Sequence, residues 1–169
     1  QNRAKNSMCI VCKWNSGEEK LDVNTEALSC SGCTSVTSIP VKEKLKELYC
    51  KGCTSLTAIP LLPELRRLVC NDCTALTAIP AMEKLKELYC GGCTALTAIP
   101  VMKKLNYLLC KGCTALTAIP DLPELAYLYC YDCTSITDIP NLPKLQTLNC
   151  DNCTSLTSIS EAKFIFADG

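Results

Sequence analysis

The sequence predicts a solenoid in which short parallel β-strands stack into one sheet. A unit of twenty residues repeats at one phase from Val41 to Ser160, with six close copies and a looser seventh before them. Leu, Cys, Cys, Thr, Leu, Thr, Ile and Pro recur almost unchanged within it. A fixed short period is typical of repeat proteins, because one unit cannot bury its apolar face alone and needs a neighbour on each side.

The strand of each unit is predicted from the alternation of its side chains. Leu48 and Cys50 should point to one side of the sheet, and Glu47 and Tyr49 to the other. The sixteenth position is proline, which lacks an N–H and fixes φ, so a helix cannot continue there. We therefore expect an extended or 3₁₀ return leg on the convex face, and a parallel sheet of about seven rungs on the concave face of a horseshoe.

The best-kept part of the unit, L-x-x-L-x-C-x-x-C-T-x-L-T-x-I-P, resembles the leucine-rich repeat, L-x-x-L-x-L-x-x-N/C-x-L. It departs from that pattern by having Cys at the sixth position and its next apolar residue at the twelfth. Ile59–Leu65, Ile119–Leu125 and Ile139–Leu145 have the pattern I-P-x-L-P-x-L. With it, the chain resembles the bacterial-type leucine-rich-repeat proteins, which include effectors delivered into host cells. The resemblance implies a right-handed, β/α-type leucine-rich-repeat solenoid.

The chain divides into one solenoid and two expected caps, which together form a single domain. We expect an N-terminal cap at residues 1–24, the solenoid at 25–160, and a C-terminal cap or tail at 161–169. The ends of a solenoid expose an apolar cross-section that atypical segments must cover. The only Trp, Trp14, follows Ile10 and Val11, and both Phe residues flank Ile165. These large apolar side chains suit that purpose.

Composition narrows the classes of function. The 17 basic and 17 acidic residues balance, so no general attraction to nucleic acid or to anionic membranes is expected. No apolar stretch approaches the ~18 residues that span a bilayer. The chain has no His, the usual partner of a catalytic Cys and the commonest metal ligand. We therefore expect a monomer that binds protein, without catalysis, cofactor or membrane insertion.

Sixteen cysteines form eight C-x-x-C pairs, which are compatible with a disulfide framework, with metal ligands, or with ordinary core residues. We favour reduced, buried core residues, because the cysteines keep the phase of the leucines and the chain is already 48% hydrophobic. At the ninth position Cys can donate to a turn carbonyl, as Asn does in related repeats. Free thiols favour a reducing cytosol, that of a bacterium or of a host after export, over an oxidising extracellular space. The structural ladder comprises Cys50, Cys53, Cys70, Cys73, Cys90, Cys93, Cys110, Cys113, Cys130, Cys133, Cys150 and Cys153.

Cys9 and Cys12 lie outside this ladder and form a separate case. The pair is compatible with a disulfide, with half of a metal site, or with a place in the N-terminal cap. Of the three, a structural place in the cap is the interpretation that we favour, and no metal site is assigned from the sequence.

The candidate binding surface is the outward side of the predicted strands. All six tyrosines lie at the third, fifth or seventh position, and tyrosine is enriched at the buried centres of protein interfaces. Alternatively, the rings only stabilise the sheet by contacts between strands. Glu47, Arg67 and Glu87 alternate in sign down one column, as neighbouring ion pairs would. The candidate partner-binding residues are Glu47, Tyr49, Arg67, Glu87, Tyr89, Tyr107, Leu109, Tyr127, Tyr129 and Tyr131, with the centre expected at Tyr107, Tyr127, Tyr129 and Tyr131.

These features favour a non-enzymatic module that binds a protein partner through a concave, tyrosine-rich sheet. The resemblance implies that a bacterial effector acting on a host protein is one such module. One alternative is the substrate-recognition arm of a larger ubiquitin-ligase-type effector, since some members of the family carry such a domain. Another is a thiol or metal buffer formed by the cysteine ladder. The repeated threonines also suggest an ice-binding face, but their phase follows the turn, where hydroxyls bond nearby backbone.

Overall fold

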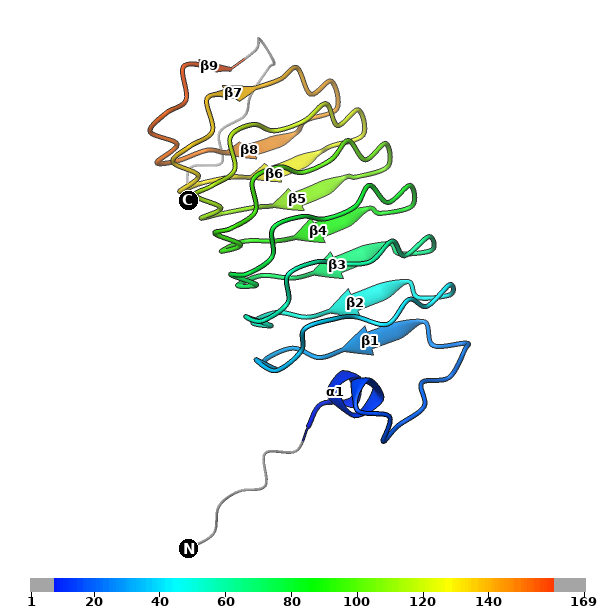
Figure 1. The fold of residues 1–169 in the computed structure, drawn as a ribbon. Coiled ribbons are helices and arrows are strands. Elements are labelled where there is room, and N and C mark those ends of the chain that lie inside the picture. Colours follow the sequence, from blue (N-terminus) through cyan, green and yellow to red (C-terminus); the bar gives the residue numbers. More distant parts are fainter. Residues whose placement is uncertain (1–7, 160–169) are drawn as a thin grey trace, which may run out of the picture.

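A computed structural model describes residues 8–159 and shows a stack of closely similar rungs (Figure 1). One strand of each rung joins a seven-stranded parallel sheet in the order β1-β2-β3-β4-β5-β6-β8. The expected parallel solenoid of about seven rungs is therefore confirmed. The strands are β1 (Ala27–Ser29), β2 (Glu47–Tyr49), β3 (Arg67–Val69), β4 (Glu87–Tyr89), β5 (Tyr107–Leu109), β6 (Tyr127–Tyr129) and β8 (Thr147–Asn149). The segment expected to form a C-terminal cap or tail at 161–169 lies outside the described residues.

Neighbouring strands pair in the register of the repeat. Each residue lies opposite the residue twenty positions later, as Leu68 does opposite Leu88. The strands are three residues long, but the ladder continues beyond them, because Cys70 N–H donates to the Tyr89 carbonyl at 2.7 Å. Equal repeat length keeps this register from rung to rung, since an insertion would move inward side chains to the outward face.

The return leg is extended, one of its two expected conformations. β7 (Asp138–Ile139) and β9 (Ser158–Ile159) form a second, two-stranded parallel sheet there, and Ala58 and Ala78 form an isolated parallel bridge. Residues 8–159 contain no 3₁₀ helix. Backbone bonds such as Thr77 N–H to the Thr57 carbonyl, at 3.2 Å, link successive return legs.

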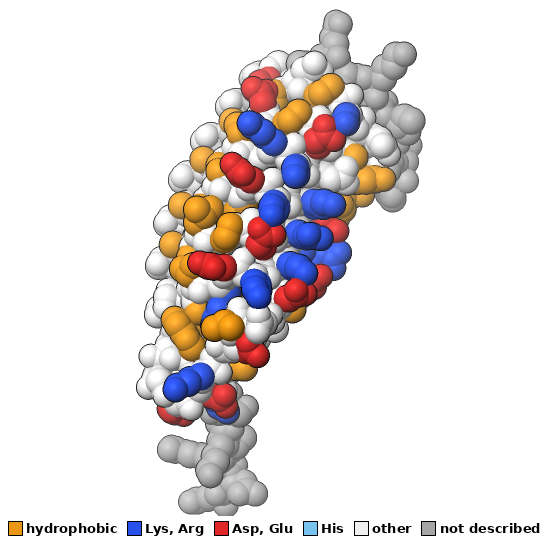
Figure 2. Space-filling view, turned by 90° about the vertical axis from the view of Figure 1, so that its right-hand side faces the viewer, with side chains coloured by type: hydrophobic (Ala, Val, Ile, Leu, Met, Phe, Trp, Pro, Cys, Tyr) orange, Lys and Arg blue, Asp and Glu red, His pale blue; other side chains and the backbone are white. Residues whose placement is uncertain are grey.

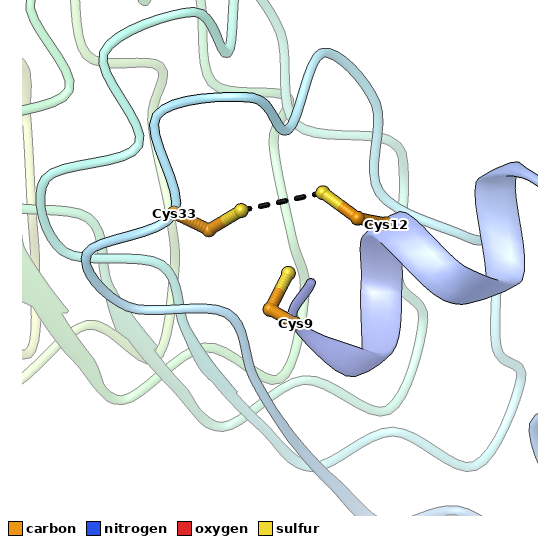
Figure 3. Close-up of side chains that lie close together, drawn as sticks. All are labelled: Cys9, Cys12 and Cys33. Atoms are coloured by element: carbon orange, nitrogen blue, oxygen red, sulfur yellow. Dashed lines mark hydrogen bonds between the residues drawn. The ribbon is translucent and has the colours of Figure 1, made fainter. Parts of the chain in front are cut away.

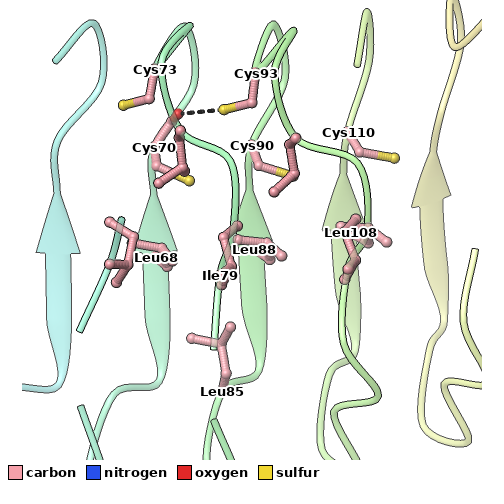
Figure 4. Packing of buried hydrophobic residues seen from close by; sticks show 14 of the residues in the cluster. Leu68, Cys70, Cys73, Ile79, Leu85, Leu88, Cys90, Cys93, Leu108 and Cys110 are labelled. Atoms are coloured by element: carbon pink, nitrogen blue, oxygen red, sulfur yellow. Dashed lines mark hydrogen bonds between the residues drawn. The ribbon is translucent and has the colours of Figure 1, made fainter. Parts of the chain in front are cut away.

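The core is a set of apolar columns that run along the solenoid between the two legs (Figure 4). In one rung Leu85, Leu88, Cys90, Cys93 and Leu96 are all fully buried. Burying one leucine side chain contributes roughly 1.5–3 kcal/mol. Within residues 8–159, no polar or charged residue is buried. Stability therefore comes from stacking like side chains on one another, one rung at a time.

The ninth-position cysteines add a hydrogen bond to this packing. Cys93 Sγ donates to the Cys70 carbonyl of the preceding rung at 3.1 Å (Figure 4), and the backbone N–H of Cys73 donates to the same oxygen at 3.3 Å. The expected bond from the ninth-position thiol to a turn carbonyl is thus confirmed. The donors are Cys53, Cys73, Cys93, Cys113, Cys133 and Cys153, at 3.0–3.1 Å.

Burial of the ladder follows expectation except at its last pair. The ten cysteines from Cys50 to Cys133 are fully buried, whereas Cys150 and Cys153 are half-buried. The prediction that all twelve are buried is wrong for these two. They lie on the last described strand rung, which has a strand neighbour on one side only among the described residues.

The first rung is covered by α1 (Ile10–Asn15), which lies beside β1 (Figure 1). Val11 is fully buried in the common core, while Trp14 is half-buried and Ile10 is 42% exposed. Of the side chains that the sequence suggested, Val11 thus makes the covering contact, together with Cys12, while Trp14 and Ile10 contribute less. With six residues, α1 is too short to cross a membrane, and the described part of the chain has no longer helix.

The eighth position of each unit requires a left-handed backbone, which the sequence analysis did not anticipate. Gly52 has φ +71°, and its N–H donates to the Asn71 carbonyl of the next rung at 2.8 Å. Glycine adopts this conformation without strain, and Asp or Asn at a smaller cost than other residues. In the sequence, the signal for this left-handed conformation was that the eighth position holds only Gly, Asp or Asn. Its occupants are Gly32, Gly52, Asp72, Gly92, Gly112, Asp132 and Asn152, all with positive φ.

Gly52→Ala should therefore lower the free energy of unfolding by about 1 kcal/mol, the cost of a left-handed alanine. An added Cβ would meet nothing closer than 3.8 Å, so the loss reflects backbone strain without a clash. Urea denaturation measures it. Lys51→Ala, at the exposed neighbouring position, is the matched control and should change stability by less than about 0.5 kcal/mol. Equal losses in the two variants would show that the eighth position has no special backbone requirement.

Candidate functional site

The candidate partner-binding side chains lie on the outward side of the sheet, as predicted. In β2 to β5 the central residue of each strand is buried and its two neighbours are half-buried. In β6 the first residue, Tyr127, is more open, with 36% of its surface exposed. We call this surface the tyrosine face, defined by Tyr49, Tyr89, Tyr107, Leu109, Tyr127, Tyr129 and Tyr131.

Four tyrosine rings of this face form one cluster centred on Tyr107. Its ring centroid is 4.9 Å from that of Tyr89, 6.1 Å from that of Tyr127 and 5.6 Å from that of Tyr129. These distances lie in the range at which aromatic pairs attract one another. The ring cluster thus includes Tyr89, and the placing of the binding centre at Tyr107, Tyr127, Tyr129 and Tyr131 stays a prediction. Tyr131 instead has the Lys111 ammonium 5.7 Å from its ring centroid, a cation–π contact.

A charged network borders the tyrosine cluster on β2 to β4. Arg67 donates to both carboxylate oxygens of Glu87, at 2.9 and 3.0 Å, and Tyr89 Oη donates to the same carboxylate at 3.1 Å. Tyr49 Oη donates to Glu47 at 2.6 Å. The expected ion pairing is thus found between Arg67 and Glu87, while the observed partner of Glu47 is a phenol.

The pKa values on this face follow from these contacts. The hydrogen bonds from Arg67 outweigh the effect of burial and lower the pKa of Glu87. Burial, reinforced by the Glu87 carboxylate, raises the pKa of Tyr89, and burial also raises the pKa of Tyr107. Both phenols are therefore neutral at physiological pH and keep an O–H donor.

The edge at which the strands begin is charged but of mixed sign (Figure 2). Lysines there pair with glutamates one rung earlier: Lys46 with Glu26 at 2.7 Å, and Lys144 with Glu124 at 2.7 Å. Since these groups are solvent-exposed, water and salt screen their attraction. These pairs place opposite charges side by side on neighbouring rungs of this edge.

A second apolar surface, which sequence reasoning missed, lies at the seventeenth position of the unit. Val41, Leu61 and Val101 are 65%, 58% and 53% exposed. They directly follow Pro40, Pro60 and Pro100, so apolar residues at these three places were the available signal, whereas Asp121 and Asn141 follow the prolines of later repeats. This exposed apolar column competes with the tyrosine face as an interaction surface.

Three thiols outside the regular ladder converge beside α1 (Figure 3). The Sγ atoms of Cys9, Cys12 and Cys33 lie within 4.8 Å of one another, and those of Cys12 and Cys33 are 3.2 Å apart. The sequence indicated that Cys9 and Cys12 are a separate pair, but it did not place Cys33 with them.

The pKa values of two of these thiols move in opposite directions. The hydrogen bond to Cys33, together with burial, raises the pKa of Cys12 to about 12. Burial alone would raise the pKa of Cys33. Hydrogen bonds from the Cys12 and Cys9 thiols and from the backbone of Ser35 and Cys9 outweigh it and lower that pKa. Of these two thiols, Cys33 therefore ionises more readily.

Comparison with known proteins supports the fold. No protein-family model matches the chain, and no curated protein matches it. Among solved structures, the chain is similar to the leucine-rich repeat domain of the type III effector XopL, with a TM-score of 0.60 and 23% sequence identity. The match covers 73% of this chain and 52% of the other, so the chain spans about half of the matched chain's length. The chain thus has the leucine-rich-repeat fold.

Replacing Glu87 by Gln tests the charged network. Because the folded-state pKa of Glu87 is lowered, its contribution to stability is present above the unfolded pKa of about 4.3 and is lost as the pH falls through the folded value. The side chains of Arg67 and Glu87 are 40% and 31% exposed, so solvent screens their attraction and Glu87→Gln should cost less than about 1 kcal/mol at pH 7. The difference from wild type should disappear in acid.

Urea denaturation at a series of pH values measures this difference. Glu43→Gln, at an exposed position, is the matched control. A cost that stays constant from neutral to acid pH would contradict an ionic origin.

Proposed function

We propose that this chain is a non-enzymatic protein-recognition module that binds a partner protein through the tyrosine face. The observation that supports this most is the cluster on the outward sheet surface in which the Tyr107 ring contacts the rings of Tyr89, Tyr127 and Tyr129. Their half-exposed side chains are free of the packing that fixes the inward columns. Covering this exposed apolar surface with a partner is energetically favourable.

The chemistry of the rings suits recognition. Tyrosine offers a rigid apolar ring with few rotamers to lose, and a polar tip that can reach a partner's backbone. Contacts within the cluster hold Tyr107 in place before a partner arrives, which reduces the entropy lost on binding. The cluster therefore has the properties of an interface centre, where aromatic anchors dominate the free energy of association.

The charged network beside the cluster can fix the orientation of a bound partner. Arg67 and Glu87 are tied to each other by two hydrogen bonds, and Tyr89 links this pair to the rings. A partner with an apolar group for the rings and a polar group for the Arg67–Glu87 pair would bind in one orientation. Polar borders of this kind contribute specificity more than affinity.

The partner class follows from two supports of different kinds. The chain resembles bacterial-type leucine-rich-repeat proteins in its repeat pattern, and it is similar in fold to a domain of a type III effector. A bacterial effector that binds a host protein is therefore the form of the proposal that we favour. The recognition arm of a larger ubiquitin-ligase-type effector would use the same face for its substrate.

The alternative of a thiol or metal buffer has little support from the sixth-position cysteines of the ladder. Cys70, Cys90 and Cys110 are fully buried, and their thiol pKa values are raised, first by their hydrogen bonds to the ninth-position cysteines and then by burial. A buried, protonated thiol is a poor ligand and a poor nucleophile.

The proposal is tested with the double variant Tyr127→Ala/Tyr129→Ala. If the tyrosine face binds the partner, affinity should fall by about 2 kcal/mol or more, roughly thirty-fold, as at an interface hot spot. Proteins captured by the wild-type chain from host-cell extract are identified by mass spectrometry, and the affinity of each variant for the purified partner is then measured. Leu61→Ser/Val101→Ser, on the exposed apolar column, is the matched control and should bind as wild type does.

Melting temperatures of the same variants separate binding from sheet stabilisation. If the rings only stabilise the sheet, the tyrosine variant will melt earlier and bind normally. Loss of affinity in the Leu61/Val101 variant alone would assign the interface to the seventeenth-position column instead.

A further inference from the structure

We propose that Cys9, Cys12 and Cys33 bind one Zn²⁺ ion, which links α1 to the first rung of the solenoid. The three Sγ atoms lie within 4.8 Å of one another, from two segments of the chain (Figure 3). A tetrahedral zinc site with Zn–S bonds of about 2.3 Å places its sulfurs about 3.8 Å apart. The 3.2 Å between Cys12 and Cys33 and the 4.8 Å limit of the cluster bracket that separation.

The first two ligands come from the start of α1. Cys9 is the residue before the helix, and its side chain makes no capping hydrogen bond to the helix backbone. Cys12 lies three residues later, so the helical turn brings both thiols to one side. Two cysteines separated by two residues are the usual half of a structural zinc site.

The third ligand is available because Cys33 stands on the first rung. Every later ninth-position cysteine from Cys53 to Cys153 donates its thiol to a carbonyl of the preceding rung. No such rung precedes Cys33, because α1 occupies that place. The Cys33 thiol instead contacts the Cys12 thiol of α1. The end of the ladder therefore presents a thiol where α1 supplies two more.

The cluster is open to solvent on one side. The three cysteines also line an open hollow of about 240 Å³ together with Met8, Ser31 and Thr34. Water or a small external ligand can enter this hollow and fill the fourth position of a tetrahedral ion.

A disulfide between Cys12 and Cys33 is the competing chemistry, and it would use two of the three thiols and leave Cys9 without a role. Zinc uses all three and needs no oxidant. Each protonated thiol releases its proton to water as its sulfur binds the ion, and no electron is transferred.

Zinc binding to the whole chain tests the proposal. After reduction and removal of bound metal, the protein is titrated with Zn²⁺ and examined by native mass spectrometry. Wild type should bind one ion per chain, and Cys9→Ser, Cys12→Ser and Cys33→Ser should each weaken binding at least ten-fold. Cys150→Ser, in the half-buried pair at the far end of the described rungs, is the matched control and should bind as wild type does.

Cobalt and thermal melting make the test independent of whether a variant folds. Co²⁺ bound to the wild-type chain should show a sulfur-to-metal charge-transfer band with the intensity of three thiolates, and Zn²⁺ should raise the melting temperature of wild type but not of Cys33→Ser. The proposal is overturned if the reduced wild-type chain binds no zinc, if the cobalt spectrum lacks thiolate ligands, or if Cys150→Ser loses binding to the same extent.

Discussion

Each rung of this solenoid is only one strand spacing deep, about 4.8 Å, and this thickness constrains every other feature of the structure. A side chain on an inward column must pack directly on the same position of the next rung. The twenty-residue period is therefore kept without insertion, and the strands pair in the register of the repeat. Columns of Leu and Cys satisfy this condition because their side chains stack on copies of themselves without a buried charge.

The cysteine ladder shows how the carbonyl groups of a buried turn find hydrogen-bond donors inside so thin a layer. The carbonyl of Cys70 accepts the N–H of Cys73 in its own rung and the Cys93 thiol of the next. One thiol per rung therefore joins neighbouring turns, while the sixth-position cysteine fills the space beneath the strand. The same regularity has a consequence at the first rung, where Cys33 has no earlier carbonyl to reach and turns toward α1. The end of the repeat thus differs in chemistry from its interior.

Sequence alone could predict the features that repeat. The period predicted the parallel sheet and its number of rungs, the alternation around Leu48 predicted which side chains point inward, and the ninth position predicted a thiol bond to a turn carbonyl. The features that it missed depend on position in the stack or on backbone conformation. Cys150 and Cys153 occupy the same repeat positions as Cys90 and Cys93, but within residues 8–159 their rung has a strand neighbour on one side only, so their partial exposure could not be read from the repeat.

The candidate site was predictable to a similar extent. The outward columns follow from alternation, so the face was found, but the selection of Tyr89 over Tyr131 for the ring cluster depends on side-chain direction. The cluster of Cys9, Cys12 and Cys33 joins segments about twenty residues apart through the docking of α1, which the period does not describe. The left-handed eighth position had a readable signal in its Gly, Asp and Asn residues.

We claim that the ladder consists of reduced thiols packed as core side chains, and labelling of individual cysteines can show whether it does. A thiol reagent is added without reductant, in buffer and in strong denaturant, and the labelled peptides are identified by mass spectrometry. The ten cysteines from Cys50 to Cys133 should stay unlabelled in the folded chain while Cys150 reacts, because they are fully buried and it is not. All should react once the chain is unfolded. Ladder cysteines that react in the folded chain as fast as Cys150, or that remain unlabelled in denaturant because they are bridged, would contradict the claim.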